Sequence, residues 1–303
     1  MVPLAFGAGI AALIPATFIG SDGTRSIFVA FFAVAFAISS LPVAARVLSD
    51  LGLLSRPFAQ LALGVATSND IVGWLLLGVV ISVVDEGSFS PSPLIVAVLV
   101  VAAVAGIVLR FGPAFLDRVT TAVHRREGGP AAEASVAVLA IVAVGAVTHA
   151  VGVEAVIGAF IAGVAIGGSK LARSSGFQAI EVTTNAIFAP LFFAIAGIRV
   201  DLTELASWDV ASWAIAVTVV ATVAKALGSY LGARAGGIGH PDALAVGAVL
   251  NARGALEIVV ATVGLTLGII DTTAYTIIVV MALMTTAVTA PLLRRTTRAV
   301  TTA

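Results

Sequence analysis

An aspartate stands near the middle of a long apolar run, at Asp70 within the segment Pro57 to Val84. The run exceeds the roughly 20 residues that a helix needs to cross a bilayer. A carboxylate at that depth costs roughly 2.5–3.5 kcal/mol on insertion scales, so such residues usually mark functional sites. We expect Asp70 to hold a monovalent cation in one state and a proton in another. The alternative is a carboxylate neutralised by a buried partner that holds helices together.

Hydroxyl groups accompany this carboxylate, in Thr67 on the same run and in Ser39 and Ser40 on an earlier one. Carboxylate, hydroxyl and carbonyl oxygens suit Na⁺ or K⁺, so we expect Asp70, Thr67 and Ser40 to bind the ion, with Ser39 in support. Each hydroxyl has an alternative, which is a hydrogen bond back to a carbonyl of its own helix. Asn69 cannot ionise, and we expect its amide to steady Asp70 or a broken-helix end.

Three further charged residues lie inside other apolar runs: Lys225, Arg253 and Glu257. Lys225 has two interpretations, a countercharge near Asp70 or a side chain that snorkels toward the end of its helix. Arg253 and Glu257 are four residues apart, a spacing that favours an ion pair on one helix face. We expect that pair to stabilise the fold around an interruption in its helix.

Two of the apolar runs carry signs of a broken helix. The run Ile27–Ala45 contains Ser39–Pro42, and its proline removes a backbone donor and clashes with the preceding turn. The run Ala243–Leu267 contains the polar segment Asn251–Gly254, which ends in a flexible residue. Irregular backbone at membrane depth is tolerated only where it is buried in protein or lines a watery cavity. We therefore predict that both helices open at these segments.

The two interruptions occupy corresponding places in the two halves of the sequence. Asp70 lies 30 residues after Ser40, and Thr285 lies 31 residues after Gly254. Each half thus has an apolar run, a broken run, and then a run with polar residues at mid-depth. Paired interrupted helices in two halves are the best sequence pointer to a transporter's binding site. We predict inverted repeats whose helix dipoles and free carbonyls meet an ion at the midplane.

The composition is that of an integral membrane protein. Of 303 residues, 60% are hydrophobic and 11% are charged, against about 25% charged in soluble domains. The net charge is zero and no basic domain is present, which argues against nucleic acid as a partner. The sequence has no cysteine and no phosphate-cradling glycine loop. We expect no enzymatic activity, and no cofactor besides the transported Na⁺ or K⁺ and H⁺.

The predicted fold is all-α, a polytopic bundle of about ten spans, two of them broken. The longest connection, Arg110–Glu133, is interpreted as a linker between two bundles. By apolar length the spans are Leu4–Ile19, Ile27–Ala45, Pro57–Val84, Pro91–Leu109, Ala134–Val153, Ala155–Gly168, Ala179–Ile198, Ser207–Ala233, Ala243–Leu267 and Tyr275–Leu293.

Lysine and arginine collect on one side of these predicted spans, as they do in cytoplasmic loops. On the other side stand only Arg25 and Arg199, while Lys225 and Arg253 lie inside runs. The expected protein is therefore a multi-pass protein of the cell membrane with both termini in the cytoplasm. The twelve basic residues on the cytoplasmic side are Arg46, Arg56, Arg110, Arg118, Arg125, Arg126, Lys170, Arg173, Arg234, Arg294, Arg295 and Arg298.

Several stretches resemble the monovalent cation:proton antiporter-2 family, within the sodium/proton exchanger superfamily, in the family's order and over essentially the whole chain. The resemblance implies two crossed broken helices, a separate dimerisation bundle and alternating access of the elevator kind. It puts the ion-carrying aspartate at Asp70, a family lysine at Lys225, and an Arg-Gly-x-x-Glu pattern at Arg253, Gly254 and Glu257. The stretches are AISSLPVAARVLSDLGLL, ALGVATSNDIVGWLLLG, GAFIAGVAIG, APLFFAIAGIRVDL, VAKALGSYLGARAGG and LNARGALEIVVATVGLTLGIID.

The domain organisation implied by this resemblance has four parts. A first core repeat with a following linker span covers 1–112, and a cytoplasmic linker covers 113–133. Part of the dimerisation bundle covers 134–200, and the second core repeat covers 201–303.

Two features depart from the family pattern. Asn69 stands where many members have a second aspartate, and the Asn-Asp form resembles that of electroneutral exchangers. Members also carry further spans before the equivalent of Leu4, so a homodimer is expected if those spans are supplied. The predicted function is exchange of Na⁺ or K⁺ for protons across the bilayer. The alternatives are a K⁺-efflux type of antiporter and a transport-inactive membrane subunit or fragment.

Overall fold

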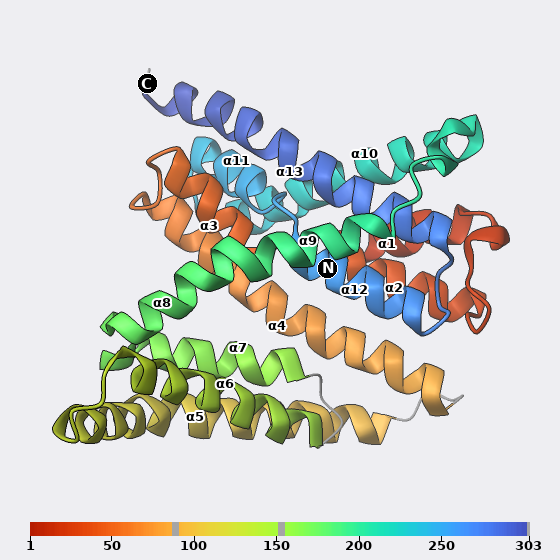
Figure 1. Ribbon diagram of the computed structural model, residues 1–303. Helices are drawn as coiled ribbons and strands as arrows, with labels where there is room; N and C mark the ends of the chain where they lie inside the picture. Colours follow the sequence, from red (N-terminus) through yellow and green to blue (C-terminus); the bar gives the residue numbers. More distant parts are fainter. Residues whose placement is uncertain (87–90, 151–154, 302–303) are drawn as a thin grey trace. The chain divides into compact units, whose positions relative to one another are not determined.

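The computed structural model describes residues 1–86, 91–150 and 155–301 (Figure 1). These residues form helices joined by turns, and their one strand-like feature is an isolated antiparallel bridge between Ile19 and Ile270. The all-helical fold expected from the sequence is confirmed. The chain divides into two compact units, one of Met1–Ser88 with Ala196–Ala303 and one of Phe89–Ile195.

The first unit contains the same order of elements twice: a helix, a helix broken in two, and a long helix. The elements of its first half are α1 (Val2–Leu13), η1 (Ala16–Phe18), α2 (Arg25–Ala37), α3 (Leu41–Asp50) and α4 (Pro57–Glu86). Those of its second half are η4 (Glu204–Ala206), α10 (Trp208–Ala235), α11 (His240–Val249), α12 (Ala255–Thr266) and α13 (Thr272–Thr301).

The second unit packs its helices around a small apolar core of Leu116, Ala137, Ile166 and Leu171. Its elements are α5 (Pro91–Arg125), α6 (Pro130–Ala150), α7 (Ala155–Gly167), η2 (Lys170–Arg173) and α8 (Ser175–Thr183), followed by the π-helical turn η3 (Thr184–Phe188) and α9 (Ala189–Ile198).

The connection after α5 is shorter than its composition suggests. The sequence predicted a linker over 113–133, but α5 stays helical to Arg125 and α6 begins at Pro130. The chain reverses at Glu127, whose φ of 56° lies in the left-handed region. Arg118, His124 and Arg125 therefore lie on the last turns of a long helix and not in an extended loop.

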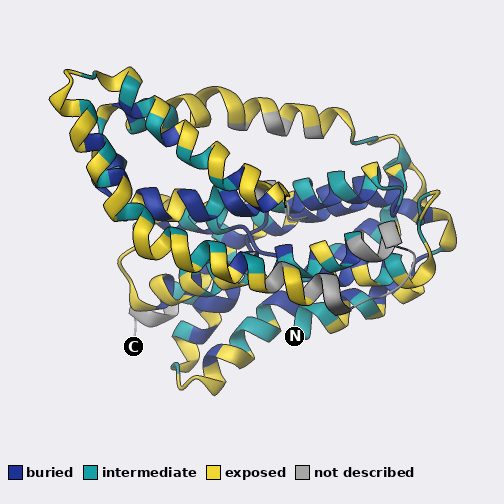
Figure 2. Ribbon diagram, turned by 90° about the horizontal axis from the view of Figure 1, so that it is seen from below, coloured by how far each residue is buried: buried dark blue, intermediate teal, exposed yellow. Residues whose placement is uncertain are grey.

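Buried phenylalanines anchor α2 along its length. Phe28, Phe31, Phe32 and Phe36 are each 0% exposed. On α12, Gly264 lies against Phe31, and a Cβ at this glycine would stand 2.3 Å from the ring, so the close approach requires glycine. In Figure 2 the buried residues gather on inner helix faces, and exposed residues follow the outer ones. The half-helix α2, which ends at the first interruption, is thus fixed in place by the packing of its phenylalanines.

Six helices in the described residues are long and apolar enough to cross a membrane. Three shorter apolar helices accompany them, Val2–Leu13, Ile157–Gly167 and Leu256–Thr266. This establishes a multi-pass membrane protein, while the count of ten spans stays a prediction. The six long spans are Arg25–Asp50, Pro57–Ile81, Leu99–Arg125, Pro130–Ala150, Trp208–Ala235 and Thr272–Thr297.

Candidate cation site

The two predicted interruptions are present, and they touch each other. The first separates α2 from α3 at residues 38–40, with Pro42 in the first turn of α3. The second separates α11 from α12 at residues 250–254. The Ser40 amide donates a hydrogen bond of 3.1 Å to the Ala252 carbonyl. Backbone groups freed by one interruption are therefore satisfied by the other, as burial at membrane depth requires.

Gly254 allows this close contact. A Cβ at Gly254 would stand 2.6 Å from Val43 Cγ2 and 3.1 Å from Ser40 Oγ. Its φ of 173° is extended backbone that any residue can adopt, so space is what requires glycine here. The predicted supporting role of Gly254 thus has a physical basis in the packing of the two interruptions.

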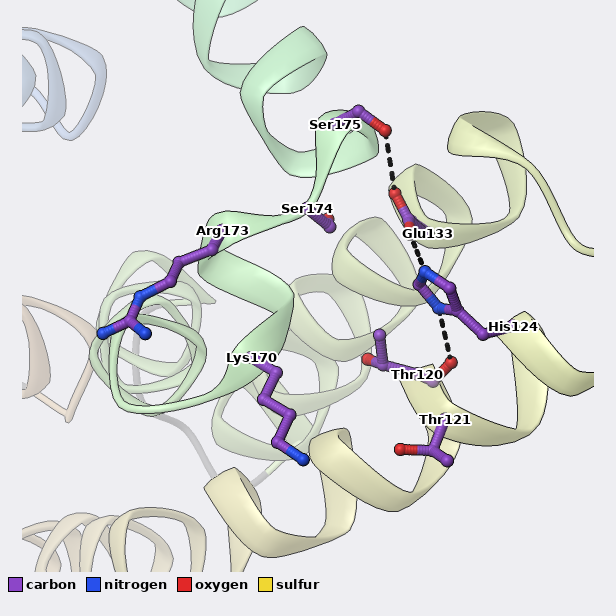
Figure 3. A pocket seen from close by; sticks show the side chains of 8 residues that line it. All are labelled: Thr120, Thr121, His124, Glu133, Lys170, Arg173, Ser174 and Ser175. Carbon is purple, nitrogen blue, oxygen red and sulfur yellow. Dashed lines mark hydrogen bonds and ion pairs between the residues drawn. The ribbon is translucent and has the colours of Figure 1, made fainter.

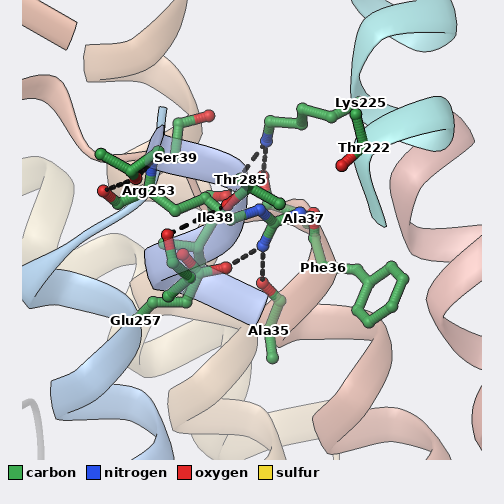
Figure 4. Close-up of polar contacts among 12 residues, drawn as sticks. Ala35, Phe36, Ala37, Ile38, Ser39, Thr222, Lys225, Arg253, Glu257 and Thr285 are labelled. Atoms are coloured by element: carbon green, nitrogen blue, oxygen red, sulfur yellow. Dashed lines mark hydrogen bonds and ion pairs between the residues drawn. The ribbon is translucent and has the colours of Figure 1, made fainter. Parts of the chain in front are cut away.

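Two cationic side chains cover the carbonyl end of α2 (Figure 4). Arg253 donates from Nη1 to the Ala35 carbonyl and from Nη2 to the Phe36 carbonyl, each over 3.1 Å. Lys225 Nζ donates to the Ala37 carbonyl and, over 3.2 Å, to the Ile38 carbonyl. The last carbonyls of a helix lack intrahelical partners and carry partial negative charge. Four successive carbonyls at the end of α2 are therefore capped by two positive charges.

The contacts of Lys225 do not fit the interpretation that its side chain snorkels. The side chain is 1% exposed, and its ammonium group points at the first interruption, so it does not snorkel. It also lies within electrostatic range of Asp70. The expected ion pair between Arg253 and Glu257 is present, with Glu257 in the first turn of α12. That position places a negative charge near the positive end of a helix dipole.

Asp70 belongs to α4, and its carboxylate lies beside the amino-terminal end of α3. It is 7% exposed, and the backbone N–H of Leu41 donates a hydrogen bond to its carboxylate. Its Oδ1 atom is buried and has no hydrogen-bond partner among the described residues. A buried carboxylate oxygen without a partner is costly, and a bound cation or proton would satisfy it.

The hydroxyl groups near Asp70 differ in how far they are already engaged. Ser40 Oγ is buried and has no partner in the described part of the chain. Thr67 donates over 2.9 Å to the Leu63 carbonyl, which is the alternative that the sequence left open. Ser39 Oγ accepts from Asn69 Nδ2 over a long 3.4 Å, in line with a steadying role for Asn69.

The Thr286 hydroxyl and the Thr285 backbone carbonyl of α13 contact the second interruption. Thr286 Oγ1 accepts from the Arg253 N–H over 3.0 Å and donates to the Arg253 carbonyl over 2.6 Å. Asn251 Nδ2 donates over 3.3 Å to the Thr285 carbonyl. The polar pair that the sequence noted on the last run thus contacts the interruption before it, as Asn69 does on α4.

Asn251 is a candidate ligand that sequence reasoning did not assign. It is 0% exposed, and its Oδ1 has no partner among the described residues. The residue follows the carbonyl end of α11, where no Lys, Arg or His side chain in the described chain donates a hydrogen bond. Its place in a polar segment at membrane depth was the available signal.

Packing brings the end of α11 toward Asp70. Ala66, one helical turn before Asp70 on α4, belongs to the same buried cluster as Val249 and Leu250. Residues four apart share a helix face, so Asp70 continues this face. Asp70 therefore lies on the face of α4 that packs toward the end of α11, where, within the described chain, the carbonyls of Val246, Ala248 and Val249 accept only backbone N–H groups.

A cavity of about 750 Å³ reaches the same region from α1, α4 and α10. Asn69 and Lys225 line it, together with Ala37 at the end of α2. Most of its wall is apolar, and Asp70 does not line it. Water and ions thus have space up to the neighbours of Asp70, one residue away along α4.

The fold and the site define an integral membrane protein with two crossed, interrupted helices around a buried carboxylate. Residues 1–298 match the family described as "Sodium/hydrogen exchanger, transmembrane". The chain belongs to this family, which confirms the resemblance seen in the sequence. The family consists of transport proteins and not of enzymes.

Named relatives agree with this assignment. Cation/H(+) antiporter 18 of Arabidopsis thaliana is 31% identical over 298 residues, 96% of this chain and 36% of the relative. K(+)/H(+) antiporter 1 of Saccharomyces cerevisiae is 31% identical over 300 residues, which are 96% of this chain and 34% of the relative. Na(+)/H(+) antiporter NhaS4 of Synechocystis is 28% identical over 268 residues, which are 88% of this chain and 64% of the relative. The chain thus spans between about a third and two thirds of these relatives.

Proposed function

We propose that this protein exchanges a monovalent cation, Na⁺ or K⁺, for protons, with Asp70 as the group that carries each in turn. The observation that carries the proposal is the buried Oδ1 of Asp70, which lacks a partner among the described residues beside the crossing of two interrupted helices. Relatives named as cation/proton antiporters support the same reaction. Because both ligands occupy one carboxylate, binding of one requires release of the other.

The proposed coordination shell consists of oxygen atoms around Asp70. Ser40 Oγ and Asn251 Oδ1 are buried and free to accept a cation, and Thr67 can add a lone pair while its hydroxyl donates to the Leu63 carbonyl. Backbone carbonyls at the end of α11 complete the shell, since the negative end of a helix dipole favours a cation. Unsatisfied acceptors of this kind are what discontinuous helices present to coupling ions in transporters.

The proposed cycle is alternating access by two inverted repeats, 1–112 with its linker span and 201–303, in a bundle of about ten spans. The repeated order of helix, broken helix and helix supports it. The region 134–200 would then belong to the bundle through which two copies pair. The basic residues counted on one side favour a cell-membrane protein with both termini in the cytoplasm.

Exchange is proposed to be electroneutral. Four charged side chains meet near the crossing, and with ionised Asp70 the charges of Lys225, Arg253, Glu257 and Asp70 cancel. A proton on Asp70 and a Na⁺ on Asp70 each raise the total by one, so the two loaded states carry the same charge. Lys225 donates to two carbonyls at the end of α2, and one-for-one exchange requires that its protonation is the same in both loaded states.

The test is transport by the full chain in liposomes clamped with K⁺ and valinomycin, measured as Na⁺-driven proton flux. We expect flux that does not respond to an imposed membrane potential. Rates that follow the potential strongly would contradict one-for-one exchange. In that case a Lys225→Gln variant that loses the response would identify Lys225 as a second proton carrier.

Two alternatives are decided by the same preparation. A relative named as a K(+)/H(+) antiporter keeps K⁺ exchange open, and parallel assays with Na⁺ and K⁺ gradients compare the two ions. A transport-inactive membrane subunit would give no cation-driven flux with either ion. That result would overturn the proposal if the reconstituted protein still shows a cooperative thermal unfolding transition, which demonstrates that it is folded.

A further inference from the structure

A stripe of exposed side chains on α5 changes from apolar to basic. Ile107, Phe111 and Phe115 are 61%, 62% and 64% exposed, and Arg118 and Arg125 continue the same helix face. The spacings of three, four and seven residues keep all five on one side of an α-helix. The stripe therefore presents apolar side chains along the middle of α5 and guanidinium groups toward its carboxyl-terminal end.

The basic end of this stripe forms one wall of a cavity of about 390 Å³. Arg118 and Arg125 line it from α5, and Lys170 lines it from η2. Asp117 also lines it, but its Oδ1 already accepts the Lys170 backbone N–H over 2.7 Å. Within the described residues none of the three cations forms an ion pair, so the cavity wall carries three positive charges against the one negative charge of Asp117.

A second cavity of about 490 Å³ adjoins the first, because Lys170 lines both (Figure 3). Its one carboxylate, Glu133, is engaged by the Gly176 N–H over 3.0 Å, the Ser175 hydroxyl over 3.3 Å and His124 Nε2 over 3.3 Å. The hydroxyl of Thr120, a residue only 5% exposed, has no partner among the described residues. The Thr120 hydroxyl and the Lys170 ammonium group thus border this second cavity, and the contacts of its one carboxylate, Glu133, are already made.

We propose that this end of the second unit binds a phospholipid with an anionic headgroup. The acyl chain lies along Ile107, Phe111 and Phe115, and the headgroup phosphate lies among Arg118, Arg125 and Lys170. Basic pockets at the ends of membrane helices attract anionic headgroups, which matches the excess of positive charge here. The apolar stripe that leads into the cavity selects a lipid over a free phosphate ion. This inference does not depend on which ion the protein transports.

The test is native mass spectrometry of the full chain, titrated with phosphatidylglycerol or with phosphatidylcholine of the same acyl chains. We expect retention of phosphatidylglycerol over phosphatidylcholine. Neutralising a basic residue near the surface weakens such binding about fivefold, so the variant Arg118→Gln/Arg125→Gln/Lys170→Gln loses the preference. Arg56→Gln, an exposed arginine that lines neither cavity, serves as the matched control and retains it.

Three results would overturn the proposal: equal retention of both lipids, a preference that survives in the triple variant, or one that Arg56→Gln abolishes equally. Displacement of phosphatidylglycerol by inorganic phosphate at equal concentration would instead assign the cavity to a free anion, and would also refute the lipid. Lys170→Gln alone replaces the triple variant if that variant does not fold, and about fivefold weaker retention is still expected.

Discussion

The two helix interruptions touch each other, yet they are satisfied in opposite ways. At the first, Lys225 and Arg253 place two positive charges on the carbonyl end of α2. At the second, neutral groups make the contacts, from Thr285 and Thr286 of α13. In the described chain no cationic side chain donates to the carbonyl end of α11.

This difference teaches where a transported cation fits. The amino-terminal end of α3 has Asp70 beside it, that of α12 has Glu257, and the carbonyl end of α2 has its two cations. Opposite charge at a helix end is stabilising, and among the described residues the carbonyl end of α11 is the one of the four half-helix ends without it. We therefore assign a structural role to the capped carbonyl end of α2, and we propose that the ion lies toward the carbonyl end of α11, with Asp70 and Ser40 among its ligands.

The largest expected effect breaks the covered end. Arg253→Ala leaves Glu257 buried without its partner and uncovers the carbonyls of Ala35 and Phe36, at a cost of about 3–5 kcal/mol in unfolding free energy. Thermal unfolding of the purified protein measures it, with exposed Arg234→Ala as the control. A melting temperature equal to that of the control would remove the structural role of the first interruption.

The next largest effect concerns Asn251, which follows the carbonyl end of α11. Asn251→Ala removes a buried acceptor that we assign to the ion, and hydrogen bonds to charged groups contribute about 1.5–3 kcal/mol. We expect a rise of about 10- to 100-fold in the cation concentration for half-maximal flux, and a lower melting temperature because the hydrogen bond to the Thr285 carbonyl is also lost. A loss of stability with unchanged cation dependence would make Asn251 purely structural.

A smaller effect tests the contact between the interruptions. Gly254→Ala puts a Cβ 2.6 Å from Val43 Cγ2, and overpacking of this kind costs about 1–3 kcal/mol. Thermal unfolding and flux should both decline. On α4, Gly64→Ala is the matched control, because nothing lies within 4 Å of its added Cβ. Equal behaviour of the two variants would show that the interruptions do not need their close approach.

The smallest effect concerns Thr67. Its hydroxyl proton is committed to the Leu63 carbonyl, so Thr67→Val removes only a lone pair from the proposed shell. We expect a change below about fivefold in cation dependence, equivalent to about 1 kcal/mol. A larger loss would raise Thr67 to a principal ligand, as expected from the sequence.

Sequence reasoning reached the class of fold and both interruptions because polar residues cluster with Pro42 in one apolar run and with Gly254 in another, a combination that favours an opening of the helix. It also found the pairing of Arg253 with Glu257, since a spacing of four residues is local. Residues far apart in the sequence were harder. Lys225 caps carbonyls 187 and 188 residues away, and no periodicity within one helix reveals such a partner.

The open acceptor of Asn251 was missed for a related reason. An asparagine in an interrupted helix has many available roles, and only the contacts of its amide show which atom remains free. The helical extension of α5 to Arg125 was also unforeseen, because polar and basic residues continue a helix past the bilayer as readily as they form a loop.

The central claim is that one carboxylate, Asp70, carries both the cation and the proton. The most direct measurement is proton release from the purified protein in weakly buffered detergent solution when NaCl or KCl is added, with choline chloride as the control. We predict one proton released per cation bound, weaker cation binding as the pH falls because protons compete for Asp70, and no release from a folded Asp70→Asn variant. Full proton release from that variant would contradict the assignment of Asp70 as the shared carrier.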